Sequence, residues 1–266
     1  MSQQTTTTEE HFYPLTNDVM FHAVFNSNKV ALKGLVCSVL HLDESEVTDI
    51  QVLSENEPPI YAGGKSYRLD IVLTLNNSSH INIEMQVDRD DWTNRSLAYL
   101  CRSYDHINRG QSYGELQPAI HIGFLDFTLF DNHPKFHSTY MLRDIDDGYT
   151  YSDNFVLKVV ELNQTDNASP EDIKFGVDRW ARLFKATSRE ELFMIAQDNT
   201  SMIEAANTAK LMYEDERIRE AIILEEERQA AIRRYENKIN TLSAENDSLS
   251  AEIKRLKKEL EEAKKK

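Results

Sequence analysis

The chain has 266 residues, of which 45 are acidic and 30 basic, and its formal net charge is −15. With 40% hydrophobic residues and only 8 Gly and 6 Pro, the composition excludes a fully disordered or collagen-like chain and fits one substantial domain with an appendage. The N-terminus lacks the basic and apolar regions of a secretory signal, and no apolar run reaches the roughly 18 residues of a membrane span. We therefore expect a cytoplasmic protein with no membrane partner.

The net negative charge lies mostly in the first part of the chain. Residues 1–130 carry 8 bases and 17 acids, whereas residues 201–266 carry 14 bases and 15 acids. A protein that binds nucleic acid through a broad basic face shows the opposite sign, because Lys and Arg neutralise the phosphates. Any binding of DNA by this chain must draw on another source of positive charge.

Residues 1–11 are polar and rich in Thr, which predicts a disordered lead-in. Thr16 or Asn17 can cap a first helix, and the apolar spacing from Leu32 to Leu40 predicts a second. The further elements expected in chain order are strands at 50–53, 67–75 and 80–87, a helix at 91–108, strands at 119–127, 136–142 and 155–162, and helices at 170–186 and 189–197. This order predicts an α/β domain over residues 12–200, with a mixed sheet flanked by helices.

The C-terminal segment has a different pattern. Residues 201–231 predict a helical connector, and apolar residues in 232–266 then recur every three and four positions, as in a coiled coil. The a positions are Ile232, Ile239, Asn246, Ile253 and Leu260, and the d positions are Tyr235, Leu242, Leu249, Leu256 and Ala263. Ile at a with Leu at d favours a parallel homodimer, and Asn246 can fix its register. The alternatives are a helix that folds back on the domain and a solvated charged helix.

The cysteines and two of the histidines have simpler interpretations. Cys37 and Cys101 are 64 positions apart with no ligand pattern near them, which predicts reduced, buried thiols. His133 and His137 are four apart, as in a zinc-binding helix, but Pro134 and the strand pattern that follows oppose a helix. We do not expect this pair to bind a metal.

Two acids stand inside apolar strand patterns. Asp70 follows Tyr67-Arg68-Leu69, and Glu84 lies within Ile81-Asn82-Ile83-Glu84-Met85-Gln86. An unpaired buried carboxylate is costly, and a divalent cation would compensate it. Oxygen ligands from Asp70, Glu84 and the backbone carbonyl of Met85 suit Mg²⁺, and Gln86 shares a strand face with Glu84.

These residues resemble those of the PD-(D/E)XK nuclease superfamily, in particular the Rpn-like recombination-promoting nucleases, also called PD-(D/E)XK nuclease family transposases. The resemblance begins at Leu15-Thr16-Asn17-Asp18-Val19-Met20-Phe21-His22-Ala23-Val24-Phe25 and continues through Arg68-Leu69-Asp70 and Asn82-Ile83-Glu84-Met85-Gln86. It ends with Arg95, Tyr99 and the segment Gln117-Pro118-Ala119-Ile120-His121-Ile122, so it covers roughly the first half of the chain.

The resemblance implies a nuclease-like fold and the hydrolysis of DNA phosphodiester bonds with Mg²⁺ or Mn²⁺, in recombination, in horizontal gene transfer or in defence against foreign DNA. It implies that Asp70 and Glu84 bind the metal, that Gln86 stands in place of the superfamily's Lys, and that Asp18 can complete the metal shell. Arg95 and Arg102 could contact DNA phosphates. Alternatively, these two arginines pair with nearby acids at the surface.

The hairpin supplies a geometric test. A four-residue loop at 76–79 would send Asp70 and Glu84 to opposite faces of the sheet, since a shift of one residue reverses every side chain. A shared metal site therefore requires a loop of three or five residues, or a bulge near Asp70.

A second function stays open from the sequence. Gln86 replaces the Lys of the superfamily name, and His22 stands where this branch more often has Lys. The chain could accordingly be a catalytically degenerate nuclease fold that acts as a coiled-coil dimeric interaction protein.

Overall fold

The computed structural model describes residues 12–53, 56–57, 67–68, 71–76, 78–89, 91–105 and 112–264. The chain divides into two compact units, Met1–Ile218 and Arg219–Lys266. Within the described residues, none of the helices combines the length and the apolar character that crossing a bilayer requires.

Two helices open the first unit, as expected. Helix α1 (Asp18–Ser27) begins after Asn17, whose side chain accepts a hydrogen bond from the backbone N–H of Met20. Helix α2 (Lys29–Leu40) begins after Asn28, which caps it in the same manner. Asn is favoured at this position because its side-chain oxygen satisfies backbone N–H groups that have no partner within the helix. The apolar faces of both helices are buried.

The centre of the unit is a mixed six-stranded sheet, in agreement with the expected fold class. Its strand order is β1-β4-β5-β6-β8-β7, and a separate two-stranded ladder pairs β2 (Asn56–Glu57) with β3 (Tyr67–Arg68). The six strands are β1 (Ile50–Val52), β4 (Ile71–Leu75), β5 (Ser79–Gln86), β6 (Ala119–Leu125), β7 (His137–Arg143) and β8 (Thr150–Glu161). Strands β5, β6 and β8 run parallel to one another, and the other pairings of the sheet are antiparallel. The strand β6 is almost entirely buried, as its continuous apolar run predicted.

The β4–β5 hairpin has the odd register that the sequence argument required. Leu75 pairs with Ser79, so three positions separate the paired strand ends, and Ile71 pairs with Ile83. The three-residue alternative is therefore confirmed, and the four-residue loop is excluded. Because side chains alternate along a strand, this register determines which residues of β4 share a face with Glu84.

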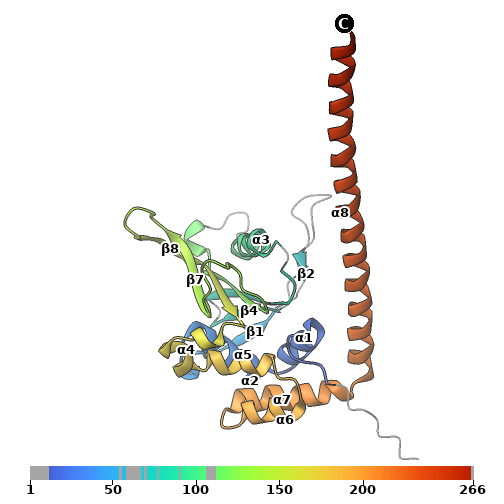
Figure 1. Cartoon of the computed structure of the whole chain (residues 1–266). Coiled ribbons are helices and arrows are strands. Elements are labelled where there is room, and N and C mark those ends of the chain that lie inside the picture. The colour runs from blue at the N-terminus through green and yellow to red at the C-terminus, as the bar shows by residue number, and fades with distance from the viewer. Residues whose placement is uncertain are drawn as a thin grey trace, which may run out of the picture. The chain divides into compact units, whose positions relative to one another are not determined.

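Helices cover both faces of the sheet (Figure 1). On one face, Phe124 of β6 packs against Phe21 of α1 and Phe184 of α5 (Val177–Phe184), with ring centroids 6.1 and 5.0 Å apart. On the other face lies α3 (Trp92–Tyr104), whose Trp92 ring fills the space beside Gly123. A Cβ atom at Gly123 would come within 2.2 Å of Trp92 Cζ2, so this approach requires glycine.

Two elements of the second half differ from expectation. The helix expected at 170–186 is divided into α4 (Pro170–Phe175) and α5, because Gly176 adopts a left-handed conformation with φ of 74° and ends α4. Strand β8 begins five residues earlier than expected, at Thr150, and pairs with β7 in a hairpin with register shifts at Leu142. The helices that follow are α6 (Arg189–Ala196) and α7 (Thr200–Glu214).

The cysteines are both free, but only one of them is buried. Cys37 on α2 is 3% exposed, as expected. Cys101 is exposed because the buried face of α3 is formed by Trp92, Ser96 and Leu100, and the residue after Leu100 points away from that face. The prediction of two buried thiols is therefore wrong for Cys101.

The second unit belongs to one helix, α8 (Glu216–Lys264), and the boundary between the units falls in its first turn. The connector expected at 201–231 is interrupted at Asp215, an extended residue that ends α7 and whose carboxylate accepts hydrogen bonds from Arg217. Along α8 the apolar a and d side chains are exposed, for example 63% at Ile239 and 58% at Leu249.

Candidate active site

A buried carboxylate lies near the end of β5. Glu84 is 5% exposed, although its neighbours along the strand, Ile83 and Met85, are apolar and point to the opposite face. Asn82, Glu84 and Gln86 alternate with these residues and so share the face that α3 covers. The sequence of β5 thus places three polar side chains in one row on the sheet.

Arg95 of α3 joins two members of this row. Its Nη2 donates hydrogen bonds to Oε1 of Glu84 and to Oε1 of Gln86. The Nε2 of Gln86 donates to the backbone carbonyl of Asp88 at 2.8 Å, while its amide oxygen faces Arg95. The two oxygens therefore converge on one cation, which at present is the guanidinium group.

His121 of β6 contacts the other oxygen of Glu84. Asn82 Nδ2 donates to His121 Nδ1 at 2.7 Å, so Nδ1 is an acceptor and the neutral ring carries its proton on Nε2. That Nε2 lies 3.6 Å from Glu84 Oε2. The pairing of Asn82 with His121 across the parallel strands β5 and β6 brings these side chains together. At this distance the two atoms are in contact but not hydrogen-bonded.

Burial governs the protonation of this cluster. It raises the pKa of Glu84 to about 7, while the charge and hydrogen bond of Arg95 oppose the shift and the negative charge of Asp18 adds to it. Burial also lowers the pKa of His121 to about 3, with a further contribution from Arg95, so the imidazole is neutral at pH 7. The charged groups of the cluster at that pH are hence Arg95 and a partly ionised Glu84.

The site residues expected from the sequence have the following positions. Asp70 lies outside the described residues. Asp18, in the first turn of α1, is close enough for its charge to affect Glu84, and Met85 lies between Glu84 and Gln86 on the strand. Arg95 points into the cluster rather than toward the acids suggested for surface pairing, whereas Arg102 lies in the last turn of α3.

Sequence reasoning did not identify Asn82 and His121 as site residues. A signal was present, because each is a polar residue inside an otherwise apolar strand and both are fully buried. Their mutual contact depends on the register between β5 and β6, and the two residues are 39 positions apart in the sequence. Local patterns do not reveal such a register.

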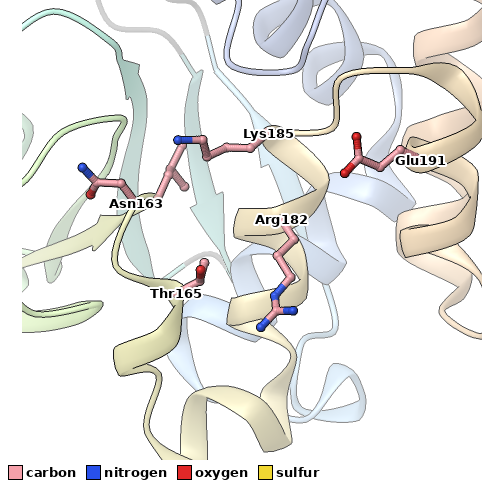
Figure 2. Close-up of a pocket in the computed structure, with 6 residues that line it drawn as sticks. Asn163, Thr165, Arg182, Lys185 and Glu191 are labelled. Atoms are coloured by element: carbon pink, nitrogen blue, oxygen red, sulfur yellow. The ribbon is translucent and has the colours of Figure 1, made fainter.

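A charged pocket of about 360 Å³ lies beyond the end of β8, lined by Leu162, Asn163, Thr165, Arg182, Lys185 and Glu191. Arg182 belongs to α5, and Lys185, the residue that follows this helix, reaches toward Asn163 (Figure 2). Lys185 Nζ lies 2.7 Å from a carboxylate oxygen of Asp126, whose backbone N–H donates to the carbonyl of Gln86 at 2.9 Å. Through Lys185 and Asp126, the pocket is connected to the end of β5, where Gln86 lies.

The comparison with known families gives a match over most of the chain. The model of the PD-(D/E)XK nuclease family transposases matches residues 15–262. No curated protein and no solved structure matches the chain. The matched range includes the whole β5 row, α3 and β6, so the family model covers the cluster around Glu84. The chain belongs to the PD-(D/E)XK nuclease family transposases.

Proposed function

We propose that this protein is a metal-dependent DNA endonuclease whose site is centred on Glu84. The observation that carries the proposal is the convergence of the Glu84 carboxylate and the Gln86 amide oxygen on one cation in a buried setting. Family membership supports a hydrolase of the nuclease kind. The dependence on metal and the cleavage of DNA are our inference.

The donor atoms fit a hard divalent cation. Glu84 and Gln86 each offer an oxygen, which is the ligand type preferred by Mg²⁺ and Mn²⁺. Glu84 Oε2 is buried and has no hydrogen-bond partner among the described residues. The hairpin has the odd register that a site shared by Asp70 and Glu84 requires, so Asp70 is proposed as a further ligand. Asp18 and the carbonyl of Met85 are proposed as additional ligands.

The side chains of the cluster have separable roles in this proposal. When bound, a divalent cation supplies Lewis-acid polarisation of the phosphate and neutralises the charge that develops there. Glu84 and Gln86 would supply carboxylate and amide oxygens as ligands of the cation. The neutral ring of His121 lies beside the second carboxylate oxygen of Glu84 and is proposed to help to position it. The attacking nucleophile is water, and one phosphorus–oxygen ester bond of the DNA is broken.

Arg95 supplies positive charge close to the proposed metal ligands. Its guanidinium can compensate Glu84 before a metal binds and contact a DNA phosphate afterwards, because the side chain is 26% exposed. Arg102, also on α3, is proposed as a second phosphate contact. These cations would supply positive charge locally in a chain whose net charge is −15.

We also propose that α8 forms a parallel two-stranded coiled coil with a second copy of the chain. The apolar a and d residues are exposed on the single helix, at 52% for Ile253 and 50% for Leu256, and burying such a stripe is what stabilises a coiled coil. Asn246 at an a position would pair with its counterpart and fix the register. Two sites on one dimer could act on one duplex, which fits a role in recombination or mobile DNA.

The test is a nicking assay on supercoiled plasmid with the full-length protein, with and without Mg²⁺. We expect nicking that requires the metal, is abolished by a chelator, and is lost in Asp70→Ala. Equal nicking by wild type and variant would indicate a contaminating nuclease and would contradict the proposal.

One observation favours the second candidate, a non-catalytic interaction protein. Arg95 already donates to one oxygen of Glu84 and to the amide oxygen of Gln86, as it would if these residues served only to stabilise the packing of α3 on the sheet. In that case the pure protein would neither bind Mg²⁺ nor nick DNA, yet would still form the α8 dimer.

A further inference from the structure

Three ligand-type side chains from separate elements meet on another part of the first unit. His41 ends α2, His137 begins β7, and Asp172 lies in α4. His41 Nε2 is 3.0 Å and His137 Nδ1 is 2.7 Å from the same oxygen, Oδ1 of Asp172. The three ligand atoms all lie within 4.8 Å of one another.

The three ligand atoms are near the spacing of a tetrahedral transition-metal site. With bonds of about 2.0–2.1 Å, two ligand atoms of a tetrahedral zinc site are separated by roughly 3.3 Å. His41 and His137 lie 3.0 and 2.7 Å from Asp172, which are hydrogen-bond lengths. Both side chains would therefore move outward by roughly 0.3–0.6 Å to hold an ion. Two imidazoles and one carboxylate form a donor set that zinc prefers and that Mg²⁺, which favours oxygen, does not.

Neighbouring groups hold one of the ligands in this orientation. The backbone N–H and the hydroxyl of Ser169 donate to Asp172 Oδ2 at 2.9 and 2.6 Å, which leaves Oδ1 facing the two histidines. His41 Nδ1 lies 3.9 Å from a carboxylate oxygen of Glu171, which is beyond hydrogen-bond distance, so Glu171 adds negative charge near the ring without orienting it.

The cluster opens on a pocket that could admit a further ligand. The pocket has a volume of about 550 Å³, and Lys158, Thr139 and Asn167 also line it. Lys158 Nζ donates to the hydroxyl of Thr139 at 3.1 Å. Lys135 lines the pocket as well, so its two ammonium groups balance the carboxylates of Asp172 and Glu171, and the donor set rather than the net charge supports a bound ion.

We propose that His41, His137 and Asp172 form a Zn²⁺ site that is separate from the Glu84 cluster. The ion would link the end of α2, the start of β7 and α4, while a water or a ligand from the pocket completes the coordination. Three protein ligands and one open position are typical of zinc sites that can bind a small ligand. His133, four residues before His137, is exposed and is not among the ligands.

The test uses the full-length protein after chelator treatment and titrates Zn²⁺ against a chromogenic competitor. We expect about one tightly bound Zn²⁺ per chain, which a large excess of Mg²⁺ does not displace. His41→Asn should weaken binding by about tenfold or more, because a ligand is lost while Asn tolerates the left-handed backbone at this position (φ of 55°). His133→Asn is the matched control and should bind zinc like the wild type.

Two results would overturn the proposal. One is an absence of tight Zn²⁺ binding by the wild type, and the other is equal affinity in the wild type and His41→Asn. If His41→Asn does not fold by circular dichroism, Co²⁺ added to the wild type decides the matter. Visible absorption bands of four-coordinate Co²⁺ are expected, and the weak spectrum of hexahydrated Co²⁺ would refute the site. Binding must also persist in Glu84→Gln, which separates this site from the proposed nuclease centre.

Discussion

Arg95 on α3 and Glu84 on β5 form a hydrogen-bonded ion pair in which the carboxylate is buried and the guanidinium is about one-quarter exposed. The pair links a helix on one face of the sheet to the strand that carries the row of polar side chains. It gives the carboxylate a positive partner in the absence of a metal. The same atoms would be available to a divalent cation, so stability and the proposed activity depend on one contact.

Replacing Arg95 by Met should destabilise the metal-free protein by about 1–3 kcal/mol at pH 8, because a buried carboxylate loses its charged donor. The folded pKa of Glu84 is raised from 4.5 to about 7, so its ionisation costs stability as the pH rises through that window. Removing Arg95 raises this pKa further. The loss measured by urea unfolding should therefore be larger at pH 8 than at pH 6.

The control for that variant is Arg89→Met. Arg89 pairs with Asp131 at 3.0 Å, but both side chains are more than half exposed, so the change should stay within about 0.5 kcal/mol. Equal effects of the two substitutions would contradict the importance assigned to the buried pair.

Substituting Ala for Gly123 should destabilise the packing of α3 on the sheet. The new Cβ would lie 2.2 Å from the buried ring of Trp92, and such overpacking costs about 1–3 kcal/mol. Gly114→Ala is the matched control, since its nearest atom would be Ser112 Oγ at 3.7 Å. Urea unfolding followed by circular dichroism should separate the two variants, and a fully stable Gly123→Ala protein would show that Trp92 is not held against the strand.

Charge at a d position should dissociate the proposed dimer. Leu249→Asp places a carboxylate in the expected seam, whereas Ala251→Asp changes the opposite side of α8 by the same charge. Both positions are exposed on the single helix, so a monomer would respond to neither. Light scattering should report monomers for Leu249→Asp and dimers for the control. A dimer that survives Leu249→Asp would show that α8 is not the main contact.

The two thiols should differ strongly in reactivity. Burial raises the pKa of Cys37 to about 11, so its thiolate fraction at pH 8 is about one in a thousand, while Cys101 is exposed. Brief treatment with iodoacetamide at pH 8 should alkylate Cys101 and leave Cys37 unmodified, as measured by peptide mass spectrometry. Raising the pH toward 11 would increase the Cys37 thiolate. Equal labelling at pH 8 would mean that α2 is not packed as described.

Local sequence patterns predicted the elements that depend on periodicity. The alternation in β5 placed Glu84 and Gln86 on one face, and the parity argument restricted the hairpin to an odd loop, which the pairing of Leu75 with Ser79 satisfies. The cap of α1 at Asn17 and the apolar run of β6 were likewise predicted from the sequence. In each case the signal lies within one element or between adjacent elements.

The remaining features depend on contacts between distant segments. Gly176 divides a helix that apolar spacing alone would continue, and the extended part of β8 carries few buried residues to mark it. His121 meets Glu84 through the register of a parallel pair, and His41 meets Asp172 over 131 positions. Such contacts are determined by the tertiary fold and produce no periodic pattern in the sequence.

The most direct test of the central claim is the initial rate of Mg²⁺-dependent nicking by wild type, Glu84→Gln and Glu161→Gln, purified in parallel. Glu161 is a matched control because it is also a buried Glu at the end of a parallel strand, yet it lies outside the cluster of Arg95 and Gln86. We predict a loss of about a hundredfold or more for Glu84→Gln and little change for Glu161→Gln. Undiminished nicking by Glu84→Gln would contradict the assignment of this cluster as the nuclease site.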